Sequence, residues 1–373
     1  MKLRVPSYYR QFRCLAGQCK HSCCIGWEID IDEETCAYYQ EIGGDFGERL
    51  KIHLKQDEET CFALTEDGRC PFLNRDNLCE ICIELGEEAL SEVCTEYPRF
   101  VTEYADVREK SMALSCEEVG RLIFESDAPL TFEEIEQETG EDLAFPEEDS
   151  EEETPFSPDD PSWYRPIEQA CDYAIRLCQD RTRSIPERTA ALLAFGKAIQ
   201  EKINREHPEE IPSAIAEFES HPQALDPEKI LGSFARRFQI YAELEVLDEE
   251  WRDTLAHVTE SFAGPAGEAR YTDWHARFAH YNQNREYEYE HLLVYFLFRY
   301  TMQTVYDCNF LSHITYAAAS LLMIQDIDTV RFIDQGETFT LADRIDTARI
   351  YSREVEHSEE NLELLQFRFT CPV

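Results

Sequence analysis

Apolar residues recur at intervals of three and four along much of the second half of the chain. This spacing predicts helices that bury one face. The predicted helical segments read "YRPIEQACDYAIRLCQD" (164–180), "ERTAALLAFGKAIQEKI" (187–203), "YEHLLVYFLFRYTMQTVY" (289–306) and "LADRIDTARIYSREVEHSEENLELLQF" (341–367). The second half is therefore predicted to be mainly helical.

The first third has a different pattern, in which short apolar runs alternate with turn residues. In "TEDGRCPFLNRDNLCEIC" (65–82), the Asp-Gly pair at 67–68 and the Asp-Asn pair at 76–77 predict the turns of a small β-meander. Cys70 and Cys79 would flank one of these turns, which is a common way to direct two thiolates at one metal ion.

Short helices are predicted beside this meander. Asp32 can cap a helix over 33–42. In "SCEE", Ser115 and Glu118 have the spacing of a capping box, which would place Cys116 in the first turn of a helix. The positive end of the helix dipole there favours a thiolate.

The segment from about 133 to 160 is rich in acidic residues and proline, which predicts a linker or mobile loop. The predicted organisation has three parts. A cysteine-rich metal-binding module with short strands covers 1–130, the acidic linker covers 131–161, and a helical domain covers 162–373. The predicted fold class is α+β, mainly α.

The net charge of −42 argues against binding to nucleic acid or to an anionic membrane surface. It is compatible with a basic partner, and equally with a role in solubility alone. The apolar window "HLLVYFLFRYTMQTVY" is short for a membrane span and contains Arg299, which predicts a buried core helix. The basic start of the chain lacks the apolar core of a signal peptide, so a cytoplasmic location is expected.

In a reducing cytoplasm, fifteen cysteines are expected to be metal ligands or buried thiols. Eleven of them lie between Cys14 and Cys116. Eight are candidate metal ligands: Cys14, Cys19, Cys23, Cys24, Cys70, Cys79, Cys94 and Cys116. They would suffice for two four-thiolate sites, or for one site with structural or redox thiols beside it.

Spacing alone does not choose between zinc and an iron–sulfur cluster, because both accept four cysteines. Adjacent side chains usually diverge, so one of Cys23 and Cys24 could bind the metal while the other packs or serves a second centre. Outside the candidate set, Cys36, Cys61 and Cys82 are expected to be inert buried thiols.

These residues resemble the flagellin lysine-N-methylase family and a related group of cysteine-rich chelating proteins. The resemblance is in "YYRQFRCLAGQCKHSCCIGWEIDID", "GRCPFLNRDNLCEI", "CTEYPRF", "SCEEVGRLIF", "HLLVYFLFRYTMQTVYD" and "RIYSREVEHSEENLELL". It implies an iron–sulfur cluster (4Fe-4S, with zinc as the alternative), S-adenosylmethionine as methyl donor, and flagellin lysines as substrate. It also implies that the eight cysteines above are candidate cluster ligands. The resemblance further covers Trp27, Asp32, Tyr97, Pro98 and Arg99. The chain departs from the family pattern at Glu117, Cys36 and Cys82, which affects the exact ligand set.

Candidate catalytic residues follow from the chemistry of methyl transfer, which needs a base to take the proton of the lysine. Glu354, His357 and Asn361 would share one helix face, and Glu354 or His357 could be that base. The alternative for this set is a buried polar network that includes an ion pair with Arg299.

Two arginines are candidate cofactor-binding residues. Arg299 could hold the donor or form a core ion pair, and Arg99 could contact the cluster or the donor, or cap a helix end. "GGDFG" (43–47) lacks the context of a dinucleotide-type glycine motif and is predicted to be a loop. The alternative function is a metal-chelating or redox-responsive binding module without catalysis.

Overall fold

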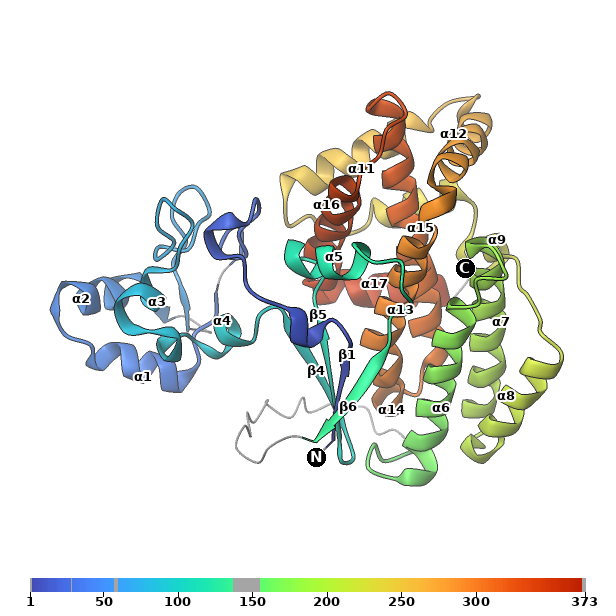
Figure 1. Cartoon of the computed structure of the whole chain (residues 1–373), viewed down its shortest axis with the longest axis horizontal. Helices are drawn as coiled ribbons and strands as arrows, with labels where there is room; N and C mark the ends of the chain where they lie inside the picture. The colour runs from blue at the N-terminus through green and yellow to red at the C-terminus, as the bar shows by residue number, and fades with distance from the viewer. Residues whose placement is uncertain (1, 28, 57–59, 137–154, 371–373) are drawn as a thin grey trace.

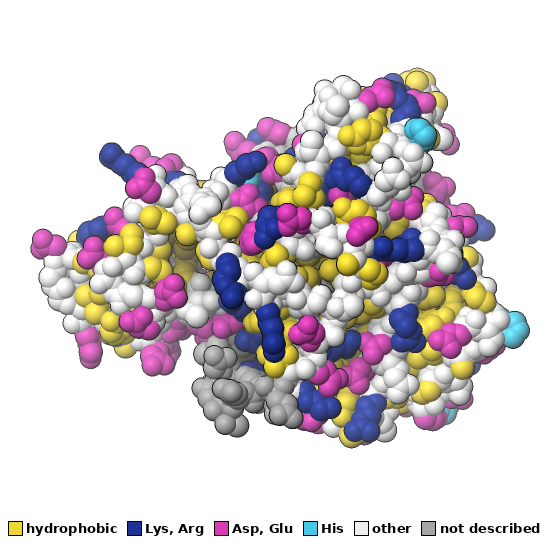
Figure 2. Space-filling model, in the orientation of Figure 1, with side chains coloured by type: hydrophobic (Ala, Val, Ile, Leu, Met, Phe, Trp, Pro, Cys, Tyr) yellow, Lys and Arg dark blue, Asp and Glu magenta, His cyan; other side chains and the backbone are white. Residues whose placement is uncertain are grey.

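The computed structural model describes residues 2–27, 29–56, 60–136 and 155–370. Figure 1 shows a small lobe, which contains α1 to α4, standing beside a larger helical body, with a β-sheet where the two meet. In Figure 2 the lobe stands out from the body, and acidic side chains are spread over both. The mainly helical α+β class predicted from the sequence is confirmed.

The sheet at the junction has four strands in the order β4-β5-β1-β6. The strands are β1 Lys2–Pro6, β4 Arg99–Tyr104, β5 Val107–Met112 and β6 Phe132–Glu136. β1 runs parallel to β5, with Leu3 opposite Arg108, and antiparallel to β6, with Leu3 opposite Ile135. β6 lies inside the predicted acidic linker, so this segment completes a sheet, while 137–154 is outside the described residues.

The small lobe is built from short elements. They are α1 Glu33–Glu41, α2 Gly44–His53, β2 Leu54–Gln56, β3 Thr60–Phe62, α3 Glu80–Leu85 and α4 Glu92–Glu96, with 3-10 turns at Ala16–Gln18 and Glu87–Ala89. The 3-10 turn Tyr9–Gln11 follows β1 and packs against the main core. Asp32 caps α1 as predicted, because its Oδ1 accepts the Thr35 N–H at 2.8 Å. The lobe has its own apolar cluster, centred on Phe62 and Phe72.

Three local predictions for this region are wrong. The meander over 65–82 forms single bridges, such as Leu73 with Cys79, in place of continuous strands. The glycine segment at 43–47 begins α2 and is not a loop. Cys116, not Ser115, is the N-cap residue of α5 (Glu117–Phe124).

The body is formed by helices of very different lengths. They are α6 Pro161–Cys178, α7 Ile185–Ile203, α8 Ile211–Ser220, α9 Pro227–Leu231, α10 Phe234–Tyr241, α11 Glu249–Ser261, α12 Gly267–Asn282, α13 Tyr287–Tyr300, α14 Thr304–Asp307, α15 Phe310–Asp334, α16 Leu341–Tyr351 and α17 Glu359–Thr370, with 3-10 turns at Pro208–Glu210, Gln283–Arg285 and Thr301–Gln303. α13 is buried along nearly its whole length, as predicted for its apolar window. Within the described residues, no helix is both long and apolar enough to cross a membrane.

The predicted helix over 341–367 is interrupted. α16 ends at Tyr351, a π-helical turn covers Ser352–Glu356, and α17 starts only at Glu359. A π turn inserts an extra residue into the helical repeat and rotates the side chains that follow it. This change of register decides which side chains of the segment reach the junction.

The main apolar core does not divide at the predicted boundary of residue 130. Tyr8, which follows β1, and Tyr104 of β4 pack with Phe124 of α5 in the same cluster as Trp163 and Phe296 of the body helices. Only the segment with α1 to α4 has a separate cluster. The independent unit is therefore the small lobe, and the sheet belongs with the body.

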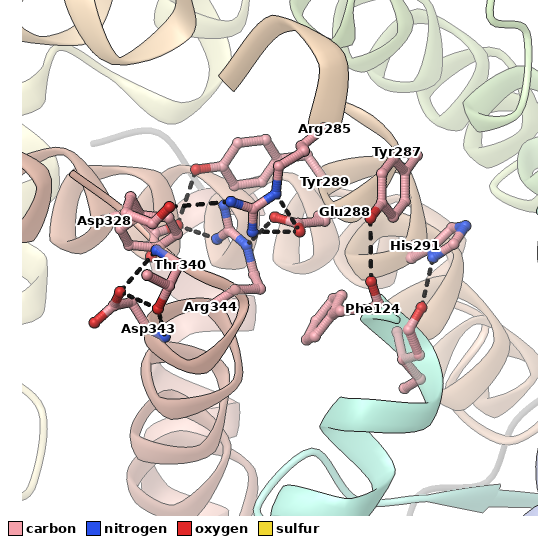
Figure 3. A network of polar contacts seen from close by, with 12 residues as sticks. Phe124, Arg285, Tyr287, Glu288, Tyr289, His291, Asp328, Thr340, Asp343 and Arg344 are labelled. Carbon is pink, nitrogen blue, oxygen red and sulfur yellow. Dashed lines mark hydrogen bonds and ion pairs between the residues drawn. The ribbon is translucent and has the colours of Figure 1, made fainter. Parts of the chain in front are cut away.

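Buried ion pairs tie the body helices together. Arg344 of α16 is fully buried and bonds to Glu288 of α13 (3.1 Å) and to Asp328 of α15, while Tyr289 donates to the same aspartate at 2.9 Å. Figure 3 shows this network, with Arg285 on the other side of Glu288. Its members come from three helices, so it fixes the positions of those helices relative to one another.

Candidate functional site at the junction

The eight candidate thiols form two groups. One group, here called the junction thiols, contains Cys14, Cys19, Cys23 and Cys116. Cys14 and Cys19 stand on either side of the 3-10 turn Ala16–Gln18, and Cys116 caps α5. The side chains of Cys14 and Cys116 lie near those of Cys19 and Cys23, and their charges raise the pKa of both thiols.

The second group, here called the lobe thiols, contains Cys24, Cys70, Cys79 and Cys94. Cys70 experiences the charges of the other three members. The two groups meet at the adjacent pair Cys23 and Cys24, whose thiols hydrogen-bond to each other. That bond lowers the pKa of Cys24 to about 7 and raises the pKa of Cys23.

Burial raises the pKa of several of these thiols, because it disfavours the charged form. The pKa of Cys19 rises to about 12 and that of Cys116 to about 11, with the neighbouring thiols adding to the effect. For Cys116 the N–H groups of Val119 and Glu118 act in the opposite direction, as expected at a helix N-terminus. The predicted dipole effect exists at Cys116, but burial outweighs it.

Among the described residues, no three His, Cys, Asp or Glu side chains are arranged to hold a metal ion as they stand. Each group nevertheless contains four soft sulfur donors, and four thiolates are the donor set of both zinc and iron–sulfur centres. Either group therefore fits such a centre in the type and number of its ligands, provided that the thiols turn toward one another.

Beside the junction thiols lies an aromatic cluster formed by Trp27, Tyr97, Phe100 and His357. The Trp27 indole N–H donates to the carbonyl of Cys23 at 2.6 Å, which links the cluster to the thiols. The rings of Trp27 and Tyr97 are 6.4 Å apart, and the His357 ring lies 6.4 Å from Tyr97 and 5.7 Å from Phe100. Trp27, Tyr97 and His357 thus form part of one site with the thiols.

His357 joins the two halves of the chain at this cluster. Its Nε2 is 2.8 Å from the Ser115 hydroxyl, which is also 3.1 Å from the Tyr97 hydroxyl. The His357 side chain remains exposed, but the surrounding protein partly desolvates the ring. This desolvation, together with the charges of Arg299 and Arg353, lowers the pKa of His357 to about 4.

Arg299 stands directly behind the cluster as a buried ion pair. Its Nε is 3.3 Å from Glu356 and 2.8 Å from the Tyr300 hydroxyl, and its guanidinium lies over the Phe100 ring at 3.5 Å. The core ion pair considered for Arg299 is present, with Glu356 as its partner. Glu356 was missed because the prediction assumed a regular helix through the π turn.

Glu354 and Asn361 do not share a site with His357. Glu354 accepts the N–H groups of Leu247 (3.0 Å) and Asp248 (3.2 Å), and burial raises its pKa to about 7. Asn361 binds the backbone of Glu245 and the carbonyl of Glu354. The predicted shared face is wrong, and these two residues anchor the segment before α11.

Arg99 takes the helix-end role considered for it. Its guanidinium donates to the carbonyls of Thr95 and Glu96 at the end of α4, and it lies over the rings of Tyr9 and Phe12. Asp32 has a second structural contact, because its Oδ2 accepts the Glu92 N–H at 2.9 Å. The structure places neither side chain in the aromatic cluster.

A polar cavity of about 220 Å³ lies away from the thiols, between the sheet and α6. Its lining includes Lys2, Arg4, Tyr164 and Glu168, and Arg4 is already paired with Glu109 at 2.9 Å. No cysteine or histidine lines it. We therefore place the candidate site by its chemistry, at the junction, and not at this cavity.

The C-terminal part of the chain decides the family. Residues 172–369 match the FliB lysine N-methylase C-terminal domain, and this range is more than half of the chain. The chain belongs to the FliB lysine N-methylase family. Arg299, Glu356 and His357 lie inside the FliB-matched range, whereas the candidate thiols lie outside it.

Curated relatives agree with the FliB assignment. A lysine-N-methylase of Salmonella typhimurium and one of Salmonella choleraesuis are each 31% identical over 132 residues, which is 33% of this chain and 33% of each relative. The flagellar biosynthetic protein FliU of Salmonella muenchen is 27% identical over 145 residues, 33% of this chain and 78% of the relative. The match to the two lysine-N-methylases thus spans about a third of their length. No solved structure matches the chain.

Proposed function

We propose that this protein is an S-adenosylmethionine-dependent protein-lysine N-methyltransferase that acts on flagellin in the cytoplasm and contains an iron–sulfur cluster. One observation carries the proposal. His357, from the FliB-matched range, meets Ser115, Tyr97 and Phe100 of the N-terminal half beside the junction thiols. The printed names of the Salmonella relatives support lysine methylation and a flagellar context.

His357 is the residue placed to relay the proton that this reaction must remove. The amine nitrogen bonds to the methyl carbon as the sulfonium C–S bond breaks, so the lysine must first lose its proton. With a pKa near 4, the His357 imidazole is neutral at neutral pH but is a weak base, so it can pass the proton on to solvent and does not hold it. Ser115 holds Nε2, which leaves Nδ1 to take the proton and release it to solvent from an exposed ring. The products are methyl-lysine and the neutral thioether.

The aromatic cluster suits the binding of cations. The faces of Trp, Tyr and Phe rings attract ammonium and sulfonium groups, and both reactants of the proposed reaction are cations before proton loss. Arg299 does not oppose this binding with a full positive charge, because Glu356 pairs with it. The net charge of −42 would draw lysine-bearing surfaces toward the protein.

The junction thiols Cys14, Cys19, Cys23 and Cys116 are the residues that would hold the cluster. Bound there, an iron–sulfur cluster would supply a redox-active iron centre next to the aromatic cluster. Cys116, at the start of α5, and Ser115, beside it, connect the two parts of the site.

The test is a methylation assay with anaerobically purified full-length protein, flagellin and a methyl-labelled donor, with mass spectrometry of flagellin lysines. The His357→Gln variant should lower kcat by about 100-fold, because a neutral amide cannot accept the proton. The His257→Gln variant is the control, since His257 is an exposed histidine that pairs with Asp334 on the body. It should leave kcat unchanged.

Label on flagellin lysines that depends on His357 supports the proposal. Absence of label from the unmutated protein with its cluster intact, or equal rates for the two histidine variants, would contradict it. Removal of the iron separately tests the cluster, because methylation that survives at full rate would exclude a catalytic role for the cluster.

The two thiol groups also favour a second candidate, a metal-binding or redox-responsive module without catalysis. This alternative expects metal-loaded protein that does not bind the methyl donor. A thermal-shift measurement distinguishes the two, because a donor that binds only the folded state raises Tm. A rise in Tm that is lost with Trp27→Ala favours the enzyme.

A further inference from the structure

Tyr295 of α13 contacts two distant parts of the chain behind the aromatic cluster. Its hydroxyl donates to the Glu356 carboxylate, whose oxygens are 3.0 and 3.1 Å away. The same hydroxyl oxygen accepts the Leu114 N–H at 3.3 Å. A hydroxyl has one proton to donate and lone pairs that accept, so both bonds can exist together. Tyr295 therefore links the end of the π turn to the segment between β5 and α5.

The two residues that Tyr295 holds are the sequence neighbours of the partners in the His357–Ser115 contact. Glu356 directly precedes His357 in the chain. Leu114 directly precedes Ser115. The His357 Nε2 and the Ser115 hydroxyl are 2.8 Å apart, although 242 positions separate the two residues. One tyrosine hydroxyl thus holds the chain on both sides of this contact, directly beside the residues that make it.

His357 lies at a point where the helix does not set its direction. It follows the π turn Ser352–Glu356, and α17 begins only at Glu359, so the residue lies in a break between two helical segments. Its side chain is exposed, so core packing does not enclose the ring. π turns are frequent at functional sites, where they redirect side chains. The direction of the His357 ring therefore depends on the contacts of the ring and of the residues beside it.

A buried network holds Glu356 in place. The Arg299 Nε is 3.3 Å from its carboxylate, and the Tyr300 hydroxyl donates to the same oxygen at 2.8 Å. Glu356 and Tyr295 are both buried. Hydrogen bonds to a charged group are stronger than those between neutral groups, and burial strengthens them further. Glu356 therefore has little freedom to move, which is the property that a support for a neighbouring reactive group needs.

We propose that Tyr295 and Glu356 are positioning residues that set the His357 ring against the Ser115 hydroxyl. Both are buried, so they act through His357 and not on the reactants. The importance of the His357 position for catalysis rests on the proposed function. The positioning itself does not, because the state of the ring can be measured without methylation.

Tyr289 provides a matched control on the same helix. It is buried, and its hydroxyl donates at 2.9 Å to Asp328, which pairs with the buried Arg344 (Figure 3). Tyr295→Phe and Tyr289→Phe each remove one hydroxyl that bonds to a buried carboxylate. Only Tyr295→Phe removes a bond beside the candidate site. The two variants should therefore differ in their effect on the site and not in the kind of contact that they lose.

The first measurement is the rate at which diethyl pyrocarbonate modifies His357 in anaerobically purified full-length protein, followed by mass spectrometry. The reagent attacks a neutral imidazole nitrogen, so the bond between Nε2 and Ser115 slows the reaction. The exposed His257 in the same sample is the reference. Tyr295→Phe should raise the rate at His357 relative to His257 by about fivefold. Tyr289→Phe should leave this ratio unchanged.

The second measurement is the methylation rate. Tyr295→Phe should lower kcat by about tenfold and leave KM unchanged, because a displaced ring slows the reaction without removing substrate contacts. In the His357→Gln background the same substitution should have no further effect, because a positioning residue acts only through the residue that it positions. Tyr289→Phe should lower kcat in neither background.

A second pair of variants tests the carboxylate. Glu356→Gln should raise the modification of His357 at least as much as Tyr295→Phe does. Glu288→Gln is its control, because it also removes a buried charge that pairs with an arginine, in the network around Arg344. Equal modification of His357 in these two variants would overturn the role of Glu356.

The outcomes separate this proposal from the proposed function. An unchanged modification rate in Tyr295→Phe, or the same increase in Tyr289→Phe, would overturn the positioning role whether or not the protein methylates flagellin. Independent losses of kcat from Tyr295→Phe and His357→Gln would also overturn it. Absence of methylation together with a selective rise in His357 modification would contradict the proposed function and support the positioning role.

Discussion

The small lobe and the helical body achieve order in different ways. The body has long helices, such as the 25-residue α15, around a continuous apolar core that also contains paired charges such as Arg344 with Glu288 and Asp328. The lobe has short elements and nine buried apolar residues. A region with a large core can include polar networks. A region with a small core needs cross-links, because it buries too little apolar surface to be stable by the hydrophobic effect alone.

The candidate site lies where the two regions meet. Arg353 of the body donates to the Ile25 carbonyl at 3.2 Å, and a Cβ at Gly26 would come within 1.9 Å of that guanidinium. On the other side, Ser115 contacts His357. A site between two regions can assemble chemical groups that neither region holds alone, but its geometry depends on the stability of both.

The largest effect is expected from Arg344→Met in the body. It removes the cation that pairs with buried Asp328 and leaves buried Glu288 with only the partly exposed Arg285, which should lower the free energy of unfolding by about 3–5 kcal/mol. Urea denaturation followed by circular dichroism measures this change. Arg285→Met is the control, because its partly exposed ion pair to the same Glu288 should contribute about 1 kcal/mol or less. Equal losses in the two variants would mean that the buried network does not stabilise the body.

The next effect tests the contact between the two regions. Gly26 and Gly68 both have positive φ (87° and 69°), so alanine at either position should cost about 1–2 kcal/mol. A Cβ at Gly68 meets no neighbour within 4 Å, whereas one at Gly26 would displace Arg353 from the Ile25 carbonyl. Gly26→Ala should therefore lose about 1 kcal/mol more than Gly68→Ala. Matched denaturation curves measure the difference, and no difference would exclude a stabilising role for the Arg353 contact.

A smaller effect compares the two cores directly. Ile81 of the lobe and Ile314 of the body are both buried, so Ile→Val at each should remove about 0.5–1.5 kcal/mol. The location of the change should differ. Ile81→Val should raise hydrogen exchange only over α1 to α4, and Ile314→Val should raise it over the body helices. Exchange that spreads over both regions in either variant would show that they unfold as one unit.

Prediction from the sequence was most accurate for the body helices that have one apolar face. The segments at 164–180 and 187–203 are helical in the structure, as α6 and α7. The longest helix, α15, was not predicted, because it is buried on most sides and shows no polar stripe that would reveal its period. Asp32 was assigned correctly because a cap acts on a backbone N–H only three residues away.

The site was harder to predict, because its contacts join distant positions. Ser115 and His357 are 242 positions apart, and no local pattern signals their contact. Ser115 was expected to cap a helix, and its hydroxyl instead bonds to Tyr97 and His357. Glu354 was selected and Glu356 was not considered, because regular helical spacing was applied to a segment that contains a π turn. The types of residue were visible in the sequence, but not which of them face one another.

The smallest effect is a pH dependence centred on His357. Its pKa in the folded protein is about 4, against about 6.5 in an unfolded chain, so between these values the unfolded state binds more protons. Stability should therefore fall as the pH falls from about 6.5 toward 4, by only about 1 kcal/mol because solvent screens an exposed ring. His357→Gln should flatten this part of the stability curve, measured by urea denaturation at several pH values, and leave stability at pH 8 close to that of the unmutated chain. If the free energy of unfolding changes equally with pH in both proteins, another group titrates in this range. The pKa of His357 would then not be lowered, and the ring would not be kept neutral as its proposed role requires.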